Sequence, residues 1–197
     1  MRFMFSRRVW RGALASIFSL TVLSGCSLIP GSGGAAYPTV DKALQRVDSV
    51  LDDTLAGIRP RVRWRDGPAH MSERRNSFTN DANGEMDVSR QRHLRTQVSE
   101  GKKKELLKIV SRRWEEKGFE AKEQNNGRPS LLSEASDGCI AKIDVGGSGD
   151  VYISVGVSAV SSGPSGDIAG EEGDSFPKAP SGASDYTPDL RDPYWSK

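Results

Sequence analysis

The stretch "CIAKIDVGGSGDVYISVGV", residues 139–157, decides the fold of this chain. It contains two runs in which every second residue is small or apolar, and the glycine-rich segment 146–149 separates them. These alternating positions are Cys139, Ala141, Ile143 and Val145 in the first run and Val151, Ile153, Val155 and Val157 in the second. A period of two is typical of a strand with one buried face, so the two runs predict an antiparallel hairpin.

Two amphipathic helices are predicted to cover that buried face. The first lies within residues 39–60, with Thr39 as its N-cap and Gly57 and Pro60 at its end. Its apolar positions recur every three or four residues: Val40, Leu44, Val47, Leu51, Leu55 and Ile58. The second runs from about Glu100 to Lys117, and one of its faces carries Leu106, Leu107, Val110 and Trp114. Each apolar stripe needs a partner surface, which the sheet provides.

Weaker strand patterns occur at 61–64, 86–98, 119–123 and 131–135, and the polar segment 70–85 is expected to be a mobile loop. This order predicts one α+β domain over residues 39–160, in which two amphipathic helices pack on one antiparallel sheet of about four to six strands. Residues 161–197 are rich in Gly, Pro and Ser and are acidic, so we expect a disordered tail. Within that tail, Tyr194 and Trp195 either dock back onto the domain or form a short binding peptide.

The N-terminal segment 1–25 has the pattern of an export signal. Its basic start contains Arg2, Arg7, Arg8 and Arg11, and an uncharged run follows over residues 12–23. That run is too short for a membrane-spanning helix, which needs about 20 predominantly apolar residues. The segment Ser6-Arg7-Arg8-Val9-Trp10 also resembles the twin-arginine export motif, with Trp10 where Phe is usual.

Leu23-Ser24-Gly25-Cys26 resembles the bacterial lipobox at all four positions. The resemblance implies cleavage between Gly25 and Cys26, with a diacylglyceryl group and fatty acyl chains such as palmitate on Cys26. Residues 26–38 are then the lipidated N-terminus and a flexible tether, and the protein is expected on the extracytoplasmic face of the cell membrane. The alternative is that a cysteine follows an ordinary or uncleaved signal by chance.

The distribution of charge along the chain bears on two classes of partner, nucleic acids and anionic lipids. Without the four arginines of residues 1–25, the chain has 24 basic and 26 acidic residues, so no nucleic-acid partner is expected. The second helix nevertheless has a basic face, which is either solvated or in contact with anionic lipid head groups. Its members are Lys102, Lys103, Lys104, Lys108, Arg112 and Arg113.

We find no motif for catalysis, for a cofactor or for a metal. The leading hypothesis is therefore a membrane-anchored, non-enzymatic binding or structural module with an envelope protein or ligand as its partner. The alternative hypothesis is an envelope hydrolase or thiol enzyme that pairs Cys139 with His70 or His93. Alternation along the strand places Cys139 on the apolar side, which favours a buried residue over a nucleophile.

Three segments carry a wider resemblance: "ALQRVDSVLDDTLAGIRP", "LLKIVSRRWEEKGFE" and "DGCIAKIDVGG". Over residues 39–158 the chain looks like a group of small uncharacterised lipoproteins from actinobacteria. Shared features are a helix that ends in Trp-x-x-x-Gly, here Trp114 to Gly118, and a strand that opens with Asp137-Gly138. Several of those proteins have a paired cysteine that this chain lacks, and the resemblance implies no activity.

Overall fold

The computed structural model describes residues 37, 39–125, 127–146, 149–161 and 173–197, all of them in the unit that begins at Gly33. The expected signal segment with Arg7, Arg8 and Gly25, the lipidation site Cys26 and most of the tether lie outside the described residues. Among the described residues, no helix has the length and apolar character needed to cross a bilayer.

The quoted stretch forms the two central strands of a six-stranded antiparallel sheet with the order β1-β2-β6-β5-β4-β3. β5 (Cys139–Val145) pairs with β6 (Val151–Ser161) from Cys139 opposite Val157 to Val145 opposite Val151, as the alternation predicted. β2 (Ala82–Leu94) and β1 (Trp64–Arg75) extend the sheet on one side, and β4 (Pro129–Ala135) and β3 (Phe119–Asn125) extend it on the other.

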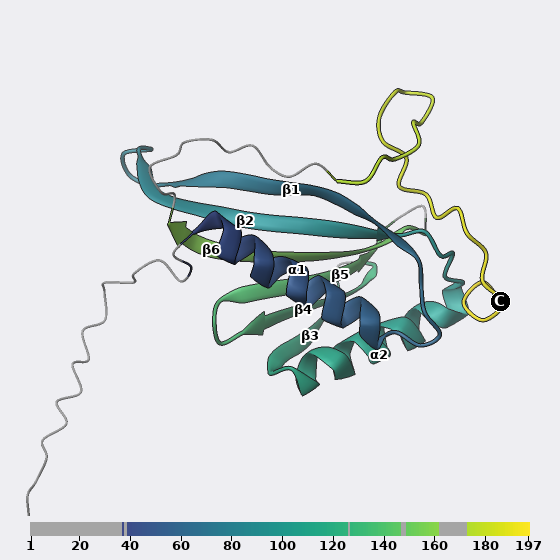
Figure 1. The fold of residues 1–197 in the computed structure, drawn as a ribbon. Helices are drawn as coiled ribbons and strands as arrows, with labels where there is room; N and C mark the ends of the chain where they lie inside the picture. Colours follow the sequence, from purple (N-terminus) through teal and green to yellow (C-terminus); the bar gives the residue numbers. More distant parts are fainter. Residues whose placement is uncertain (1–36, 38, 126, 147–148, 162–172) are drawn as a thin grey trace, which may run out of the picture. The chain divides into compact units, whose positions relative to one another are not determined.

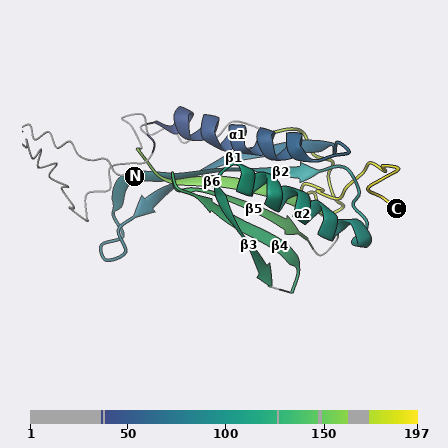
Figure 2. The ribbon, with the colours of Figure 1, turned by 90° about the horizontal axis from the view of Figure 1, so that it is seen from below.

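Both helices lie on one face of this sheet, which confirms the predicted α+β fold (Figures 1 and 2). α1 (Val40–Gly57) contacts β6 and β2, and α2 (Glu100–Glu116) contacts β3 and β4. The Thr39 hydroxyl caps α1 by accepting a hydrogen bond from the Lys42 backbone N–H at 3.3 Å. The cap and the apolar stripe therefore fix where α1 begins and which face it turns to the sheet.

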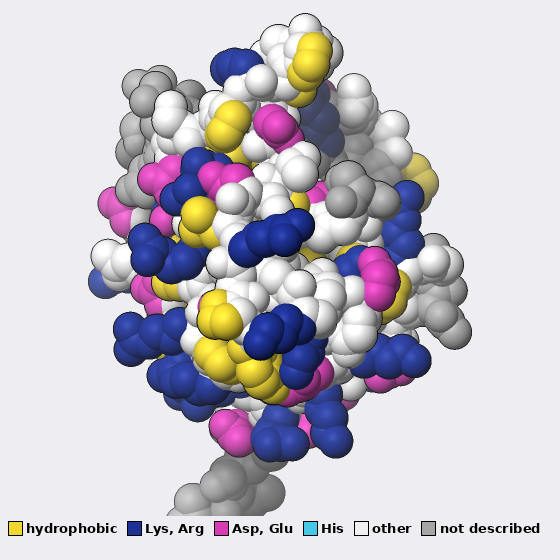
Figure 3. All heavy atoms as spheres, turned by 90° about the vertical axis from the view of Figure 1, so that its right-hand side faces the viewer, with side chains coloured by type: hydrophobic (Ala, Val, Ile, Leu, Met, Phe, Trp, Pro, Cys, Tyr) yellow, Lys and Arg dark blue, Asp and Glu magenta, His cyan; other side chains and the backbone are white. Residues whose placement is uncertain are grey.

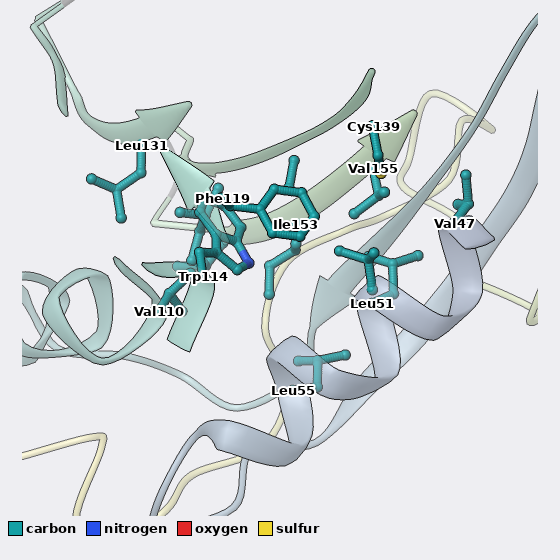
Figure 4. Packing of buried hydrophobic residues seen from close by; sticks show 14 of the residues in the cluster. Val47, Leu51, Leu55, Val110, Trp114, Phe119, Leu131, Cys139, Ile153 and Val155 are labelled. Atoms are coloured by element: carbon teal, nitrogen blue, oxygen red, sulfur yellow. The ribbon is translucent and has the colours of Figure 1, made fainter. Parts of the chain in front are cut away.

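The core fills the space between the helices and the sheet. Leu51 and Leu55 of α1 point toward Ile153, while Trp114 of α2 lies beside Phe119 (Figure 4). The helices also share one buried polar link. The Trp114 Nε1–H donates to Thr54 Oγ1 at 2.8 Å, and the Thr54 hydroxyl donates to the carbonyl oxygen of residue 50 at 2.7 Å. This chain of hydrogen bonds satisfies two polar groups that burial would otherwise leave unpaired.

The expectation of a mobile loop over residues 70–85 is wrong. β1 and β2 run through most of this segment, and only residues 76–81 connect them. Cross-strand ion pairs such as Arg74 with Glu85, at 2.9 Å, replace apolar pairs in this outer part of the hairpin. A strand pair with polar side chains on both faces has no alternation of apolar and polar residues, so its sequence does not predict strands.

The prediction of a disordered tail is also wrong for residues 173–197, because this segment packs on the domain. Trp195 is fully buried, and its Nε1–H donates to the Pro60 carbonyl oxygen at 2.8 Å. The Ser99 backbone N–H donates to the Trp195 carbonyl oxygen at 2.8 Å, and Leu190 pairs with Thr96 in a parallel bridge. The docking alternative for Trp195 is therefore the correct one.

The same segment packs on the face of the sheet that the helices leave open. Its Phe176 and Tyr186 contact His93 of β2, with ring centroids 5.4 and 4.2 Å from the imidazole. Two hydrogen bonds from the Arg95 guanidinium hold Asp189, at 2.9 and 2.7 Å, and lower the pKa of that carboxyl to about 2. Low apolar content predicts that a segment has no core of its own, but it does not prevent docking onto a formed one.

Truncation of the docked tryptophan tests this packing. Trp195→Ala removes a fully buried indole and leaves the Pro60 carbonyl oxygen without its donor, so we expect the free energy of unfolding to fall by about 3–5 kcal/mol. Urea denaturation measures this loss as a lower midpoint. The control is Phe78→Ala, which truncates a 96% exposed ring and should change stability by less than about 0.5 kcal/mol. Equal midpoints for both variants would contradict the docking.

Candidate functional site

The basic face predicted for α2 divides into groups with different roles. Lys103 does not belong to it, because its side chain is buried and its ammonium pairs with Glu100. The reason is that residues 103, 106, 110 and 114 all face the sheet, and the aliphatic stem of Lys103 continues this apolar stripe by one turn. The prediction that Lys103 is part of an exposed cationic face is therefore corrected.

Two further cations of the run are engaged inside the domain. The Lys102 ammonium pairs with Glu105 at 2.9 Å and lies 3.7 Å from the centroid of the Tyr194 ring. Arg113, on the side of α2 that faces α1, donates to Asp53 at 2.5 Å. These contacts fix the tail and α1 against α2, which leaves Lys102 and Arg113 less free to contact a ligand.

Lys104, Lys108 and Arg112 remain, and all three are exposed. Their spacing of four residues places them in one row along α2, with neighbours about 6 Å apart. Within the described part of the chain, none of the three forms an ion pair. Neighbouring cations in such a row repel one another, and an anion bound along the row reduces this repulsion.

This row lines one wall of a groove of about 1020 Å³ between α2 and the β3–β4 hairpin. Arg128 adds a fourth cation from the turn between the two strands, opposite the helix. Leu107 and the buried Leu131 contribute apolar surface, and Leu131 points from β4 toward α2 in Figure 4. Two acidic residues, Glu115 and Glu123, also line the groove, so its charged side chains sum to an excess of cations.

Figure 3 shows the end of the domain at the right of Figure 1. Lysine and arginine side chains are spread over its lower half, around a small group of hydrophobic side chains. The groove has the size of a typical ligand pocket, about 300–1,000 Å³. Its apolar surface and cationic rim suit a ligand with negative charge. Among the described residues, no group of three or more His, Cys, Asp or Glu side chains could hold a metal ion.

The structure does not bring together the proposed thiol and its histidine partners. Cys139 is fully buried on the face of the sheet that the helices cover, and burial raises the pKa of its thiol to about 11. His93 lies on the opposite face under the tail, where burial lowers the pKa of its imidazole. His70 pairs with Ser89 and so shares the face of His93. The sheet therefore separates Cys139 from both histidines.

Asp137, two residues before β5, holds the start of the described chain. Its carboxylate accepts hydrogen bonds from the Tyr37 hydroxyl at 3.0 Å, from Arg46 Nε at 2.8 Å and from the Cys139 backbone N–H at 3.1 Å. Burial and the Asp137 carboxylate together raise the pKa of the Tyr37 hydroxyl to about 12. Residue 37 is thus fixed to the domain.

Sequence reasoning found the three helical cations of the groove but missed Arg128. A single arginine in a turn has no pattern that connects it to a helix more than ten residues away. Only the packing of α2 on β3 and β4 places the two sides of the groove opposite each other.

Comparison with known proteins gives no relative for this chain. No protein-family model, no curated protein and no solved structure matches it.

Labelling of the thiol tests whether Cys139 is available for chemistry. In the native chain we expect no reaction with a water-soluble maleimide at pH 8, because the side chain is buried and its pKa is about 11. In urea the same thiol should react rapidly. Rapid labelling of the native protein, abolished by Cys139→Ala, would contradict this expectation and favour the thiol-enzyme hypothesis.

Proposed function

We propose that this chain is a membrane-anchored, extracytoplasmic lipoprotein that binds an anionic ligand in the groove between α2 and the β3–β4 hairpin. The anchor is the lipidated Cys26, and the domain acts without catalysis. The observation that carries the binding role is the row Lys104, Lys108 and Arg112, which form no ion pair with any described residue, with Arg128 facing them.

The direction of the strands supports a ligand from the envelope space. Tyr37, the described residue nearest the tether, pairs with Val160 near the end of β6. β6 is antiparallel to β5, and β5 to β4, so the β3–β4 turn with Arg128 lies at the other end of the sheet. The groove thus opens at the end remote from the anchor, which favours a free anion over the head groups of the bilayer that holds the lipid.

The buried Cys139 and its separation from both histidines favour a binding role over a hydrolase or thiol enzyme. The mature chain has more acidic than basic residues, which disfavours nucleic acid as the ligand. A contact between the basic face and anionic lipid is the competing use of the same cations. The experiment below separates the two sources of negative charge.

Binding of inorganic polyphosphate to the full mature chain tests the groove. Lys108→Gln removes the middle cation of the row and should weaken polyphosphate binding by about tenfold, with a shallower dependence of affinity on salt. The matched control is Lys122→Gln, which removes one exposed charge from the neighbouring β3 outside the groove and should leave affinity within about twofold. Isothermal titration at two salt concentrations measures both values.

A parallel arm uses vesicles of phosphatidylglycerol and the Cys26→Ala chain, which has no lipid of its own. The proposal expects weak vesicle binding that Lys108→Gln does not change. Vesicle binding that depends on Lys108, without polyphosphate binding, would show that the cations serve a lipid surface. Equal loss of polyphosphate binding in Lys108→Gln and Lys122→Gln would contradict a site in the groove.

A further inference from the structure

The turn between β1 and β2 exposes an aromatic ring at its tip. Phe78 has 96% of its surface accessible, more than any other large hydrophobic side chain among the described residues. The five residues Asn76-Ser77-Phe78-Thr79-Asn80 carry no charge. The nearest charges on either side are Arg75, the last residue of β1, and Asp81, just before β2.

Hydrogen bonds within the turn fix its backbone, so that the Phe78 ring points outward. The Asn76 side-chain oxygen accepts hydrogen bonds from the backbone N–H groups of Phe78 at 2.9 Å and Thr79 at 3.4 Å. The Asn80 N–H donates to the Asn76 carbonyl oxygen at 2.8 Å, and Arg75 donates to the Asn80 carbonyl oxygen at 2.9 Å. With its backbone tied in this way, the loop presents Phe78 at little further cost in conformational entropy.

The tip lies at the end of the sheet where the tether is attached. Tyr37 pairs with Val160, Val160 pairs with Met86, and Met86 pairs with Glu73, so these residues stand at one level of the sheet. From that level β2 extends four more residues to its first residue, Ala82, a distance of about 14 Å at 3.4 Å per residue. The start of α1 and the β1–β2 turn lie at the same end of the domain in Figures 1 and 2.

The tether confines this end of the domain to the neighbourhood of the bilayer. Ten residues, 27–36, separate Cys26 from Tyr37. A fully extended chain of this length spans at most about 40 Å, and a flexible one has a typical end-to-end distance of about 20 Å. A tip that projects beyond the point of attachment then lies within reach of the lipid surface.

We propose that the β1–β2 tip inserts Phe78 into the interface of the membrane that carries the Cys26 lipid. This inference rests on the proposed lipid anchor. The anchor supplies a high effective concentration of lipid, so one aromatic side chain is enough for a contact that a free domain would not make. An aromatic ring in an uncharged loop fits the zone between head groups and acyl chains, where aromatic side chains gather.

The charges below the tip limit how deeply it inserts. Arg74 pairs with Glu85 at 2.9 Å, and Arg75 pairs with Glu73 at 3.4 Å. These ion pairs stay in water, so only the five uncharged residues enter the interface. The contact is apolar, and salt should not weaken it. Insertion of the tip would keep this end of the sheet at the bilayer, with the groove at the opposite end directed away from it.

An environment-sensitive fluorophore on the tip tests this contact. The full mature, lipidated Phe78→Cys variant is labelled with nitrobenzoxadiazole on the introduced cysteine. The labelled protein is then reconstituted into phosphatidylcholine vesicles. Cys139 is buried, so the introduced thiol is the one that reacts. The control is Ser181→Cys, an exposed position in the tail, whose segment 173–184 lies at the right-hand side of Figure 1. Flotation of the same sample reports whether the chain is anchored.

We expect the label at position 78 to shift its emission to shorter wavelength and to be quenched by brominated acyl chains, at low and at high salt. The label at position 181 should show neither effect. A chain that floats with the vesicles while its position 78 label stays as water-exposed as that at position 181 overturns the insertion alone, and points to a protein partner for the tip. A chain that does not float overturns the anchor and the insertion with it.

Discussion

The apolar face shared by β5 and β6 determines the arrangement of everything else in the domain. Eight positions on these two strands alternate inward, and together they form an apolar surface whose removal from water contributes much of the driving force for folding. Two helices are needed to cover a sheet that the flanking hairpins widen to six strands. α1 lies over β6 and β2, so α2 is displaced toward β3 and β4, and the groove forms along its outer side.

This arrangement gives the two ends of the sheet different character. One end holds Tyr37, its partner Asp137 and the β1–β2 tip, so it is the end at which the described chain begins. The other end holds the β3–β4 turn with Arg128, and the tail closes it where Trp195 enters the core. A lipid on Cys26 would orient the first end toward the bilayer and leave the cations of the groove open to the envelope space.

The sequence predicted those elements whose residues bury one face in a regular pattern. α1 and β5 were predicted to within a residue or two, because residues such as Leu51 and Ile143 lie on periods of about 3.6 or of two. The start of β6 at Val151 was also predicted, but this strand continues four residues beyond Val157, to Ser161. The part of the β1–β2 hairpin within residues 70–85 and the docked tail were missed, because ion pairs, main-chain hydrogen bonds and single anchors such as Trp195 hold them without any period.

The candidate site was predictable in part for the same reason. A cationic stripe on a helix can be read from spacing, so Lys104, Lys108 and Arg112 were identified in advance. The same spacing places Lys103 on the apolar stripe with Leu106, Val110 and Trp114, but its charge favoured the cationic face, and the structure shows that the side chain is buried. Arg128 joined the site only through tertiary packing.

One measurement tests most directly whether the domain works from a membrane: intact mass and membrane fractionation of the native protein beside a Cys26→Ala variant. The expected result is a native chain that begins at Cys26, carries the mass of a diacylglyceryl group with an added acyl chain, and sediments with membranes, while the variant does not. A native chain that is soluble and unmodified would contradict the lipid anchor, and with it the orientation proposed for the groove and the tip.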